Sequence, residues 1–273
     1  MSSLGWGRQP SIDLGKAGAS ARRMYDEENA GHRARRTRWR ATAGVGALLL
    51  PAVALADSAP PSVAAAVALL TSGAGVWAAE RLHVRLHGEE RGTSWRIGAE
   101  GEEATAELLK PMSRRGWVWL HDRSVQGRQF NLDHIGVPPD GAELYAVETK
   151  RWPRGWVVSL DGRGRLLSAP IRQPYRTRSQ EKDVDAFIRE TDAMARYAEK
   201  LPLVRYMAIH GAGVSGGRMK ISRYSEVLGR PVDIHVVDAA RLPLDLSART
   251  ARMANTYEAQ SVAAWAARRF PRR

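Results

Sequence analysis

An acidic residue and a lysine stand two positions apart in the stretch YAVETKRW, which covers residues 145–152. Residues two apart in a β-strand point to the same face, so Glu148 and Lys150 share a side with Leu144 and Ala146. Charged groups at the end of an otherwise apolar strand cost desolvation unless a partner compensates. One explanation is a plain salt bridge; another is a site that binds a cation and positions a water molecule for hydrolysis.

A second carboxylate lies in the preceding apolar stretch, NLDHIGV at residues 131–137. A PPDG turn at residues 138–141 predicts that this stretch pairs with the next strand as an antiparallel hairpin, which brings Asp133 close to Glu148. Two adjacent carboxylates repel each other, and a divalent cation relieves the repulsion. A divalent cation held between Asp133 and Glu148 would therefore suit this pair. His134 alternates onto the opposite face and is expected to be a hydrogen-bonded core histidine.

A predicted helix at residues 100–113 supplies a third acidic candidate. Helical neighbours lie three and four residues apart, so Glu103 falls on a solvated side. Glu102 borders the expected core stripe of Ala104, Leu108 and Met112, and is the acid best placed to face the sheet. Glu100 and Glu103 are instead expected to stabilise the start of the helix through its dipole.

The elements that must position these groups alternate between strand and helix patterns. The pattern predicts a mixed α/β domain at about residues 95–270. Strands are expected at residues 116–121, 131–137, 143–150, 156–160, 165–168, 204–210 and 232–237. Helices are expected at residues 100–113, 179–200 and 247–269.

Three motifs in this order resemble the nuclease-related domain (NERD) family of the PD-(D/E)xK, or restriction-endonuclease-like, superfamily. They are Gly-x-Glu-Gly-Glu at residues 98–102, Asn-Leu-Asp-His-Ile at 131–135 and Val-Glu-Thr-Lys-Arg-Trp at 147–152. The likeness extends over about residues 95–200. It implies a mixed sheet flanked by helices, which is the restriction-endonuclease-like form of the α/β class.

The resemblance also assigns roles to individual residues. It implies that Asp133 and Glu148 are metal ligands, Lys150 the catalytic lysine and Glu102 the helix acid, with Gln180 matching a downstream helical glutamine. Two departures stand out: Leu132 occupies the position of the proline in the superfamily name, and one extra residue follows Lys150 before the Gly-Trp pair at 155–156.

Two apolar runs precede this domain, at residues 41–56 and 62–79, and Asp57 is the only charged residue from 41 to 79. A bilayer-spanning helix needs about 20 apolar residues, so each run is short. Neither run has a polar face, and arginines flank both outer ends but not the turn between the runs. These features favour a two-helix transmembrane hairpin over a buried hairpin of a soluble protein. They place both termini and the domain in the cytoplasm of a multi-pass cell-membrane protein.

The remaining segments complete a four-part organisation. Residues 1–40 are expected to be a disordered basic segment, 41–79 the hairpin, 80–97 a charged linker and 98–270 the nuclease-like domain. The formal net charge is +13, from 42 Lys and Arg against 29 Asp and Glu, which favours polyanionic partners. The chain contains no cysteine, which excludes disulfides and cysteine-ligated zinc.

The expected function is a membrane-anchored, Mg²⁺- or Mn²⁺-dependent nuclease acting on DNA. One alternative is a non-catalytic module that keeps a nuclease-like fold for nucleic-acid binding or as a scaffold at the membrane. A third is a helical membrane protein in which the acidic cluster is purely structural.

Overall fold

The computed structural model describes residues 12–55, 59–87, 93–125, 130–198, 201–249 and 256–272. The chain divides into two compact units. One comprises residues 1–21 and 97–273 and is called the α/β unit below. The other comprises residues 22–96 and is called the hairpin unit.

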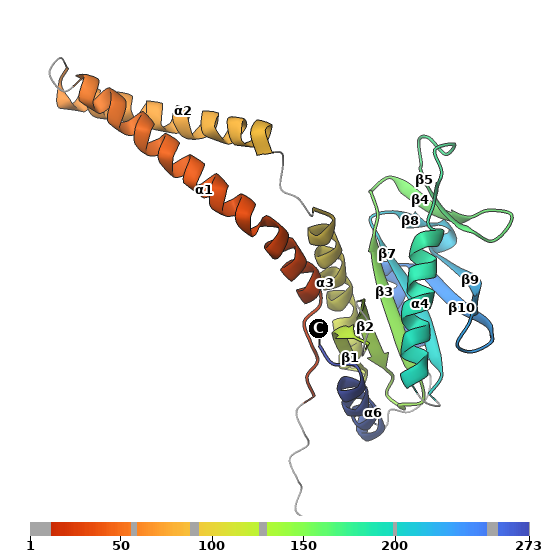
Figure 1. Cartoon of the computed structure of the whole chain (residues 1–273). Coiled ribbons are helices and arrows are strands. Elements are labelled where there is room, and N and C mark those ends of the chain that lie inside the picture. The colour runs from red at the N-terminus through yellow and green to blue at the C-terminus, as the bar shows by residue number, and fades with distance from the viewer. Residues whose placement is uncertain are drawn as a thin grey trace, which may run out of the picture. The chain divides into compact units, whose positions relative to one another are not determined.

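A six-stranded mixed sheet forms the centre of the α/β unit (Figure 1). Its strand order is β1 (Val118–Ser124), β2 (Asn131–Val137), β3 (Leu144–Arg151), β7 (Leu203–His210), β10 (Arg230–Asp238) and β9 (Arg218–Ser225). β3, β7 and β10 run parallel, and the other neighbouring strands pair antiparallel. β3 therefore lies inside the sheet and is covered on both faces, which explains why its first four residues, 144–147, are all apolar.

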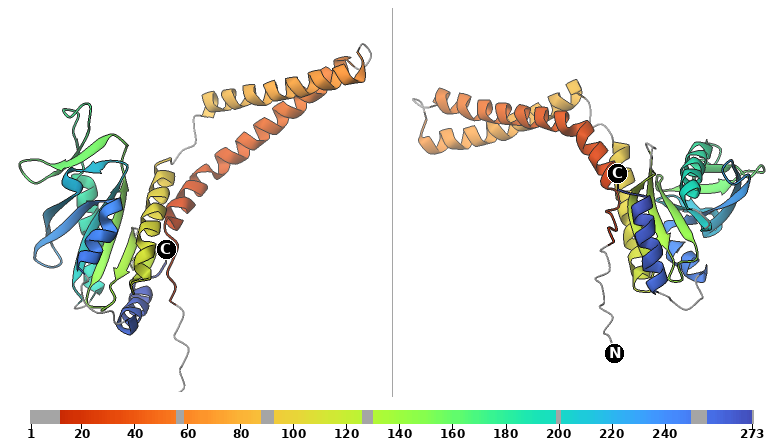
Figure 2. Two further views of the ribbon diagram at one scale, coloured as in Figure 1. Left: turned by 180° about the vertical axis from the view of Figure 1, so that it is seen from behind. Right: turned by 60° about the horizontal axis from the view of Figure 1, so that its bottom comes forward.

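The side chains of β3 alternate between two hydrophobic cores. Ala146 packs in a core that includes residues of α4 (Glu181–Tyr197) and α6 (Thr256–Arg269). Val147 packs in a second core with residues of α3 (Thr93–Ser113) and α5 (Leu242–Arg249). The ribbon views show α3 and α4 on opposite faces of the sheet (Figures 1 and 2).

A smaller four-stranded sheet extends from the end of β3. Its order is β6 (Arg178–Ser179), β5 (Leu166–Pro170), β4 (Trp156–Leu160) and β8 (Gly213–Val214). Two short 3₁₀ helices, Ser215–Gly217 and Ala239–Arg241, complete the described elements of the α/β unit. The chain passes through β5 and β6 of this sheet and then enters α4.

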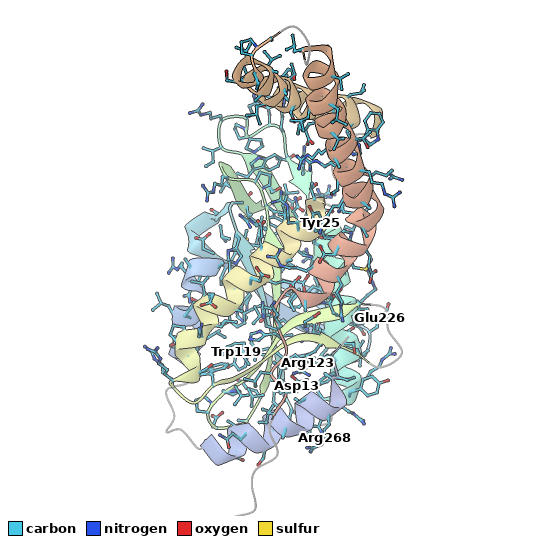
Figure 3. The ribbon with its side chains drawn as sticks, turned by 90° about the vertical axis from the view of Figure 1, so that its left-hand side faces the viewer. Asp13, Tyr25, Trp119, Arg123, Glu226 and Arg268 are labelled. Atoms are coloured by element: carbon cyan, nitrogen blue, oxygen red, sulfur yellow. The ribbon has the colours of Figure 1, made fainter. Side chains whose placement is uncertain are left out.

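The N-terminal part of the α/β unit is a segment that we call the strap, residues 12–21. The backbone N–H of His121 donates to the Leu14 carbonyl at 2.7 Å, and Arg123 donates to the carbonyl of Asp13. Figure 3 shows Asp13 beside Arg123. Gly15 and Gly18 have φ of +76° and +72°, and an added Cβ at either position would lie under 3 Å from a backbone oxygen. The backbone of the strap therefore lies in close contact with the backbones of β1 and α3.

The hairpin unit consists mainly of α1 (Ala19–Leu55) and α2 (Pro61–His87). Thr71 Oγ1 donates to the Ala47 carbonyl at 2.7 Å, and Ser72 Oγ donates to the Gly44 carbonyl at 3.2 Å. Arg36 and Arg40 both form ion pairs with Glu80. These contacts pair the two helices antiparallel, with small residues where the backbones approach.

The N-terminal half of the chain differs from the sequence-based prediction. Residues 1–40 were expected to be disordered, but residues 12–18 lie on the α/β unit and α1 already begins at Ala19. Residues 1–11 lie outside the described part of the chain. The expected linker at 80–97 is helical up to His87 and again from Thr93. Contacts between segments, including Glu80 with Arg36 and Arg40, favour helix where composition alone favours a linker.

Within the described residues, one helical segment is long and apolar enough to cross a membrane, Pro61–His83. The apolar run at 41–56 is continuous with the charged first half of α1. A two-helix transmembrane hairpin therefore stays a prediction.

The mixed α/β class predicted for the second half of the chain is confirmed, with a six-stranded sheet flanked by helices. Three observed strands were missed: β9 and the two-residue strands β6 and β8. The exposed side chains of β9 are charged or polar, and the strand follows a glycine-rich stretch. The expected final helix at 247–269 is instead two helices, α5 and α6, which are separated by residues outside the described part.

Candidate active site

The hairpin of β2 and β3 brings two carboxylates together. The register pairs His134 with Val147, which sets Asp133 beside Glu148 on the face covered by α4. Both side chains are buried, with 8% and 7% of their residue surface exposed. The backbone N–H of Thr149 donates to Asp133 Oδ2 at 2.8 Å. The pairing predicted from the PPDG turn is confirmed.

Lys150 extends from the same face of β3 as Glu148. Its Nζ atom lies 2.8 Å from Glu148 Oε1 and 3.7 Å from Asp183 Oδ1 of α4. Burial by itself lowers the pKa of this amine, but the carboxylates of Glu148 and Asp183 outweigh it and hold the pKa above its usual value. The lysine is therefore a fixed cation between β3 and α4.

Glu102 reaches the same cluster from α3. Its Oε2 atom accepts a hydrogen bond from the backbone N–H of Gly18 in the strap at 3.0 Å. Burial, together with the charges of Glu148 and Asp122, raises the pKa of Glu102 to about 8. Glu102 was expected to face the sheet, and the structure places it there.

The stripe of α3 that covers the sheet differs from the prediction in its details. Thr105, Leu109 and Met112 are buried, whereas Ala104 is exposed. The expected stripe of Ala104, Leu108 and Met112 was rotated by about one residue from the observed one. Gly101 explains the difference, because its lack of a side chain lets α3 approach Thr149 and Arg151 closely.

Asp122 is a buried acid that the sequence motifs did not identify as part of the cluster. It accepts hydrogen bonds from the Ser20 hydroxyl at 2.6 Å, the Ser20 N–H at 2.9 Å and the Asn131 side-chain amide at 2.9 Å. It is also the one non-glycine residue with positive φ in the described chain, at +52°. Its position at the end of a predicted strand was the available signal.

Helix α4 adds a further acid, Glu190. Asp183, Phe187, Glu190 and Met194 recur at the spacing of one helix face, and Phe187 and Met194 are fully buried. Burial raises the pKa of Glu190 to about 9, with Glu148 as the strongest charged neighbour. A glutamate on the apolar face of an amphipathic helix, here half-buried, was the signal that sequence reasoning overlooked.

The opposite face of the sheet carries a chain of hydrogen bonds under the site. His134 contacts His121 at 2.7 Å between the Nδ1 atoms, and its Nε2 atom contacts Thr149 Oγ1 at 3.3 Å. Thr149 Oγ1 donates to Thr105 Oγ1 at 3.0 Å, which contacts His210 Nε2 at 2.7 Å. Burial holds the pKa of His134 well below its usual value. The expectation of a hydrogen-bonded core histidine at this position is confirmed.

Gln180 precedes α4, at the N-cap position. Its side-chain amide donates to Ser168 Oγ of β5 at 2.7 Å. This donor is therefore committed to the small sheet, one helical turn from Asp183. The structure places Gln180 next to the site without a hydrogen bond to the predicted carboxylates.

The residues suit a hard divalent cation, although they are not arranged around one. No group of three or more acidic or histidine side chains among the described residues is positioned to hold a metal ion. Glu102, Asp133 and Glu148 instead contact Gly18, Thr149 and Lys150, respectively. Carboxylate oxygens are the ligands that Mg²⁺ and Mn²⁺ prefer.

The electrostatics of the cluster also fit a cation. Burial is the main cause of the raised pKa values of Glu102, Asp133 and Glu190, and the Glu148 charge adds to each of them. A buried group of acids with this mutual repulsion is one that a divalent cation would stabilise.

Comparison with known proteins identifies part of the chain. Residues 97–201 match the family described as the nuclease-related domain, NERD. The matched segment contains α3 and the β2–β3 hairpin with its acidic cluster. No curated protein and no solved structure matches the sequence.

Proposed function

Because residues 97–201 match the nuclease-related domain family, which the PD-(D/E)xK superfamily includes, we propose that this protein hydrolyses phosphodiester bonds in DNA with the help of Mg²⁺ or Mn²⁺. The observation that carries the proposal is the juxtaposition of Asp133, Glu148 and Lys150 at neighbouring strand positions. A bound divalent cation would offset negative charge at the scissile phosphate.

Residues of the chain would bind the cation, orient the attacking water and stabilise the developing charge. Asp133 and Glu148 would hold the cation, since both are buried carboxylates on one face of the sheet. Lys150 would orient the attacking water and stabilise developing negative charge through its ammonium group. Glu102 would complete the acidic side of the site from α3, held in place by the strap.

Nucleic-acid binding is supported by the loops that follow β3. Five arginines there are exposed, and Tyr175 between them has 76% of its surface exposed. Arginines bind phosphates, and exposed aromatic rings stack on unpaired bases. The arginines are Arg163, Arg165, Arg172, Arg176 and Arg178. We take this rim as the surface that would contact the DNA backbone.

Membrane attachment forms part of the proposal. The segment Pro61–His83 has the length and composition of a membrane span, and several of its large apolar side chains are exposed, among them Leu69, Leu70 and Trp77. With α1 paired against it, the hairpin unit would anchor the protein in the cell membrane. Both termini and the nuclease-related domain would then lie in the cytoplasm.

The test uses the full-length protein in detergent, because the strap precedes the hairpin unit and a fragment starting at residue 95 would lack it. Supercoiled and linear DNA are incubated with Mg²⁺, Mn²⁺ or EDTA. We expect cleavage that requires the cation and is lost in Glu148→Ala and Lys150→Ala. Glu107→Gln, an exposed change on α3, is the control. Cleavage by the Glu148→Ala protein would refute the assignment, and DNA binding without cleavage in any metal would favour a binding module.

A further inference from the structure

Glu190 occupies a position where a carboxylate is expensive. It lies on the face of α4 that contains the buried Phe187 and Met194, and its Oε2 atom is inaccessible to solvent. Within the described part of the chain, no hydrogen-bond donor contacts this oxygen. Buried polar atoms without partners are rare in native structures, and one explanation is a missing ion.

The charged groups around Glu190 include two residues of the proposed site, Glu148 and Lys150. Glu148 is its strongest charged neighbour, followed by Lys150, Arg189 and Asp183. Glu148 is also the strongest charged neighbour of Asp133, which comes from β2. The charge of Glu148 therefore acts on an acid from the adjacent strand and on an acid from the covering helix.

The helix position of Glu190 matches this arrangement. Asp183 stands near Lys150, at the end of β3, so α4 runs antiparallel to β3 from there. Glu190 follows seven residues later, or about 10 Å along the helix, on the same side as Asp183. That displacement corresponds to about three residues of β3, which places Glu190 over the stretch that includes Glu148 and agrees with the influence of the Glu148 charge on Glu190.

A purely structural role would explain the position less well. The pair Glu148–Lys150 is already formed, so Glu190 is not needed to neutralise the lysine. A glutamine or leucine would fill the same half-buried position without a carboxylate oxygen that is buried and unpaired. A cation bound next to Glu148 would explain why Glu190 carries a carboxylate.

We propose that Glu190 is an additional acidic ligand of the divalent-cation site, contributed by α4 and acting next to Glu148. This inference rests on the proposed function. It adds to the strand motifs a ligand that lies 40 residues beyond Lys150 and outside those motifs.

The test is calorimetric titration of the full-length protein with Mn²⁺, without DNA, for the wild type, Glu190→Gln and Asp185→Asn. Asp185 is an exposed acid on the same helix and serves as the matched control. We expect Glu190→Gln to weaken Mn²⁺ binding at least tenfold and Asp185→Asn to change it less than twofold. Glu190→Asp, which keeps the charge but shortens the side chain, should fall between them.

Thermal unfolding in EDTA separates binding from folding. Because Glu190→Gln removes a buried acid, the metal-free variant should unfold at the wild-type temperature or above. Wild-type affinity in the Glu190→Gln protein would overturn the inference and leave the proposed function intact. Unchanged affinity in Asp133→Asn as well, or no Mn²⁺ binding by the wild type, would overturn both.

Discussion

The Nζ atom of Lys150 lies 2.8 Å from Oε1 of Glu148, and both side chains project from β3 towards α4. A purely structural salt bridge would show the same contact, so the contact alone does not distinguish a structural from a catalytic lysine. The surrounding buried acids, Asp133 and Glu102, make the difference. An isolated salt bridge has no need of two further carboxylates.

Replacing Lys150 by arginine tests this distinction. Arginine keeps the positive charge but presents a wider, planar group that stays protonated. We expect Lys150→Arg to bind Mn²⁺ and fold as the wild type does, yet to cleave DNA at least about a hundredfold more slowly, the scale for the loss of one positioned group that stabilises transition-state charge. Cleavage rates and Mn²⁺ titration are measured side by side. A near wild-type rate would reduce Lys150 to a partner of Glu148.

The metal-free protein should become less stable as the pH rises. Glu102 and Glu190 have pKa values of about 8 and about 9 in the folded state, raised from 4.5 mainly by burial. Between pH 4.5 and these values, the folded state holds protons that the unfolded state has released. The stabilisation that comes from this difference in protonation is complete below about pH 4.5 and is lost as the pH rises through 8 to 9. Each group can contribute a slope of up to about 1.4 kcal/mol per pH unit.

The measurement is the unfolding temperature in EDTA between pH 6 and pH 9. We expect it to fall with pH, and to fall less steeply in Glu102→Gln. Mn²⁺ at pH 8 should raise the unfolding temperature of the wild type, since a cation that binds only the folded state stabilises it. A pH profile identical in wild type and variant would contradict the raised pKa of Glu102.

Gly18→Ala should disturb the site through the strap. Gly18 has φ of +72°, and an added Cβ would lie 2.8 Å from the carbonyl oxygen of Ala99 in α3. Gly155 has φ of +76° with no atom near an added Cβ, so Gly155→Ala reproduces the backbone strain without the clash. Strain alone costs about 1–3 kcal/mol.

We therefore expect Gly18→Ala to lower the unfolding temperature more than Gly155→Ala does. It should also weaken Mn²⁺ binding, because the backbone N–H of residue 18 would no longer hold Glu102. Equal effects of the two variants on both measurements would mean that the strap does not support the site.

The hairpin unit should keep the full-length protein in membranes during a high-salt wash. Salt screens the attraction between arginines and anionic lipids, but it does not release a helix whose apolar side chains lie in the bilayer. Replacing the exposed Leu69 and Leu70 by glutamate should abolish retention, because charges at the centre of a span are costly. Release of the wild type by salt would show that the arginines hold it there.

The sequence by itself determined the β2–β3 hairpin and its chemistry. Strand alternation put Glu148 and Lys150 on one face, and the PPDG turn set the pairing that brings Asp133 beside them. These relationships are local, because a two-residue period and a short turn fix them without distant contacts. Glu102 followed from helix periodicity in the same way.

Only the tertiary structure decided which distant segments complete the site. Gly18 meets Glu102 across 84 residues, and Asp183 lies 3.7 Å from Lys150 because α4 covers that face of the sheet. Composition predicted a disordered N-terminus because residues 1–40 are rich in glycine, serine and arginine. The order of the strap depends on backbone contacts with β1 and α3. Such contacts follow from how elements pack together, and no periodicity in the sequence encodes them.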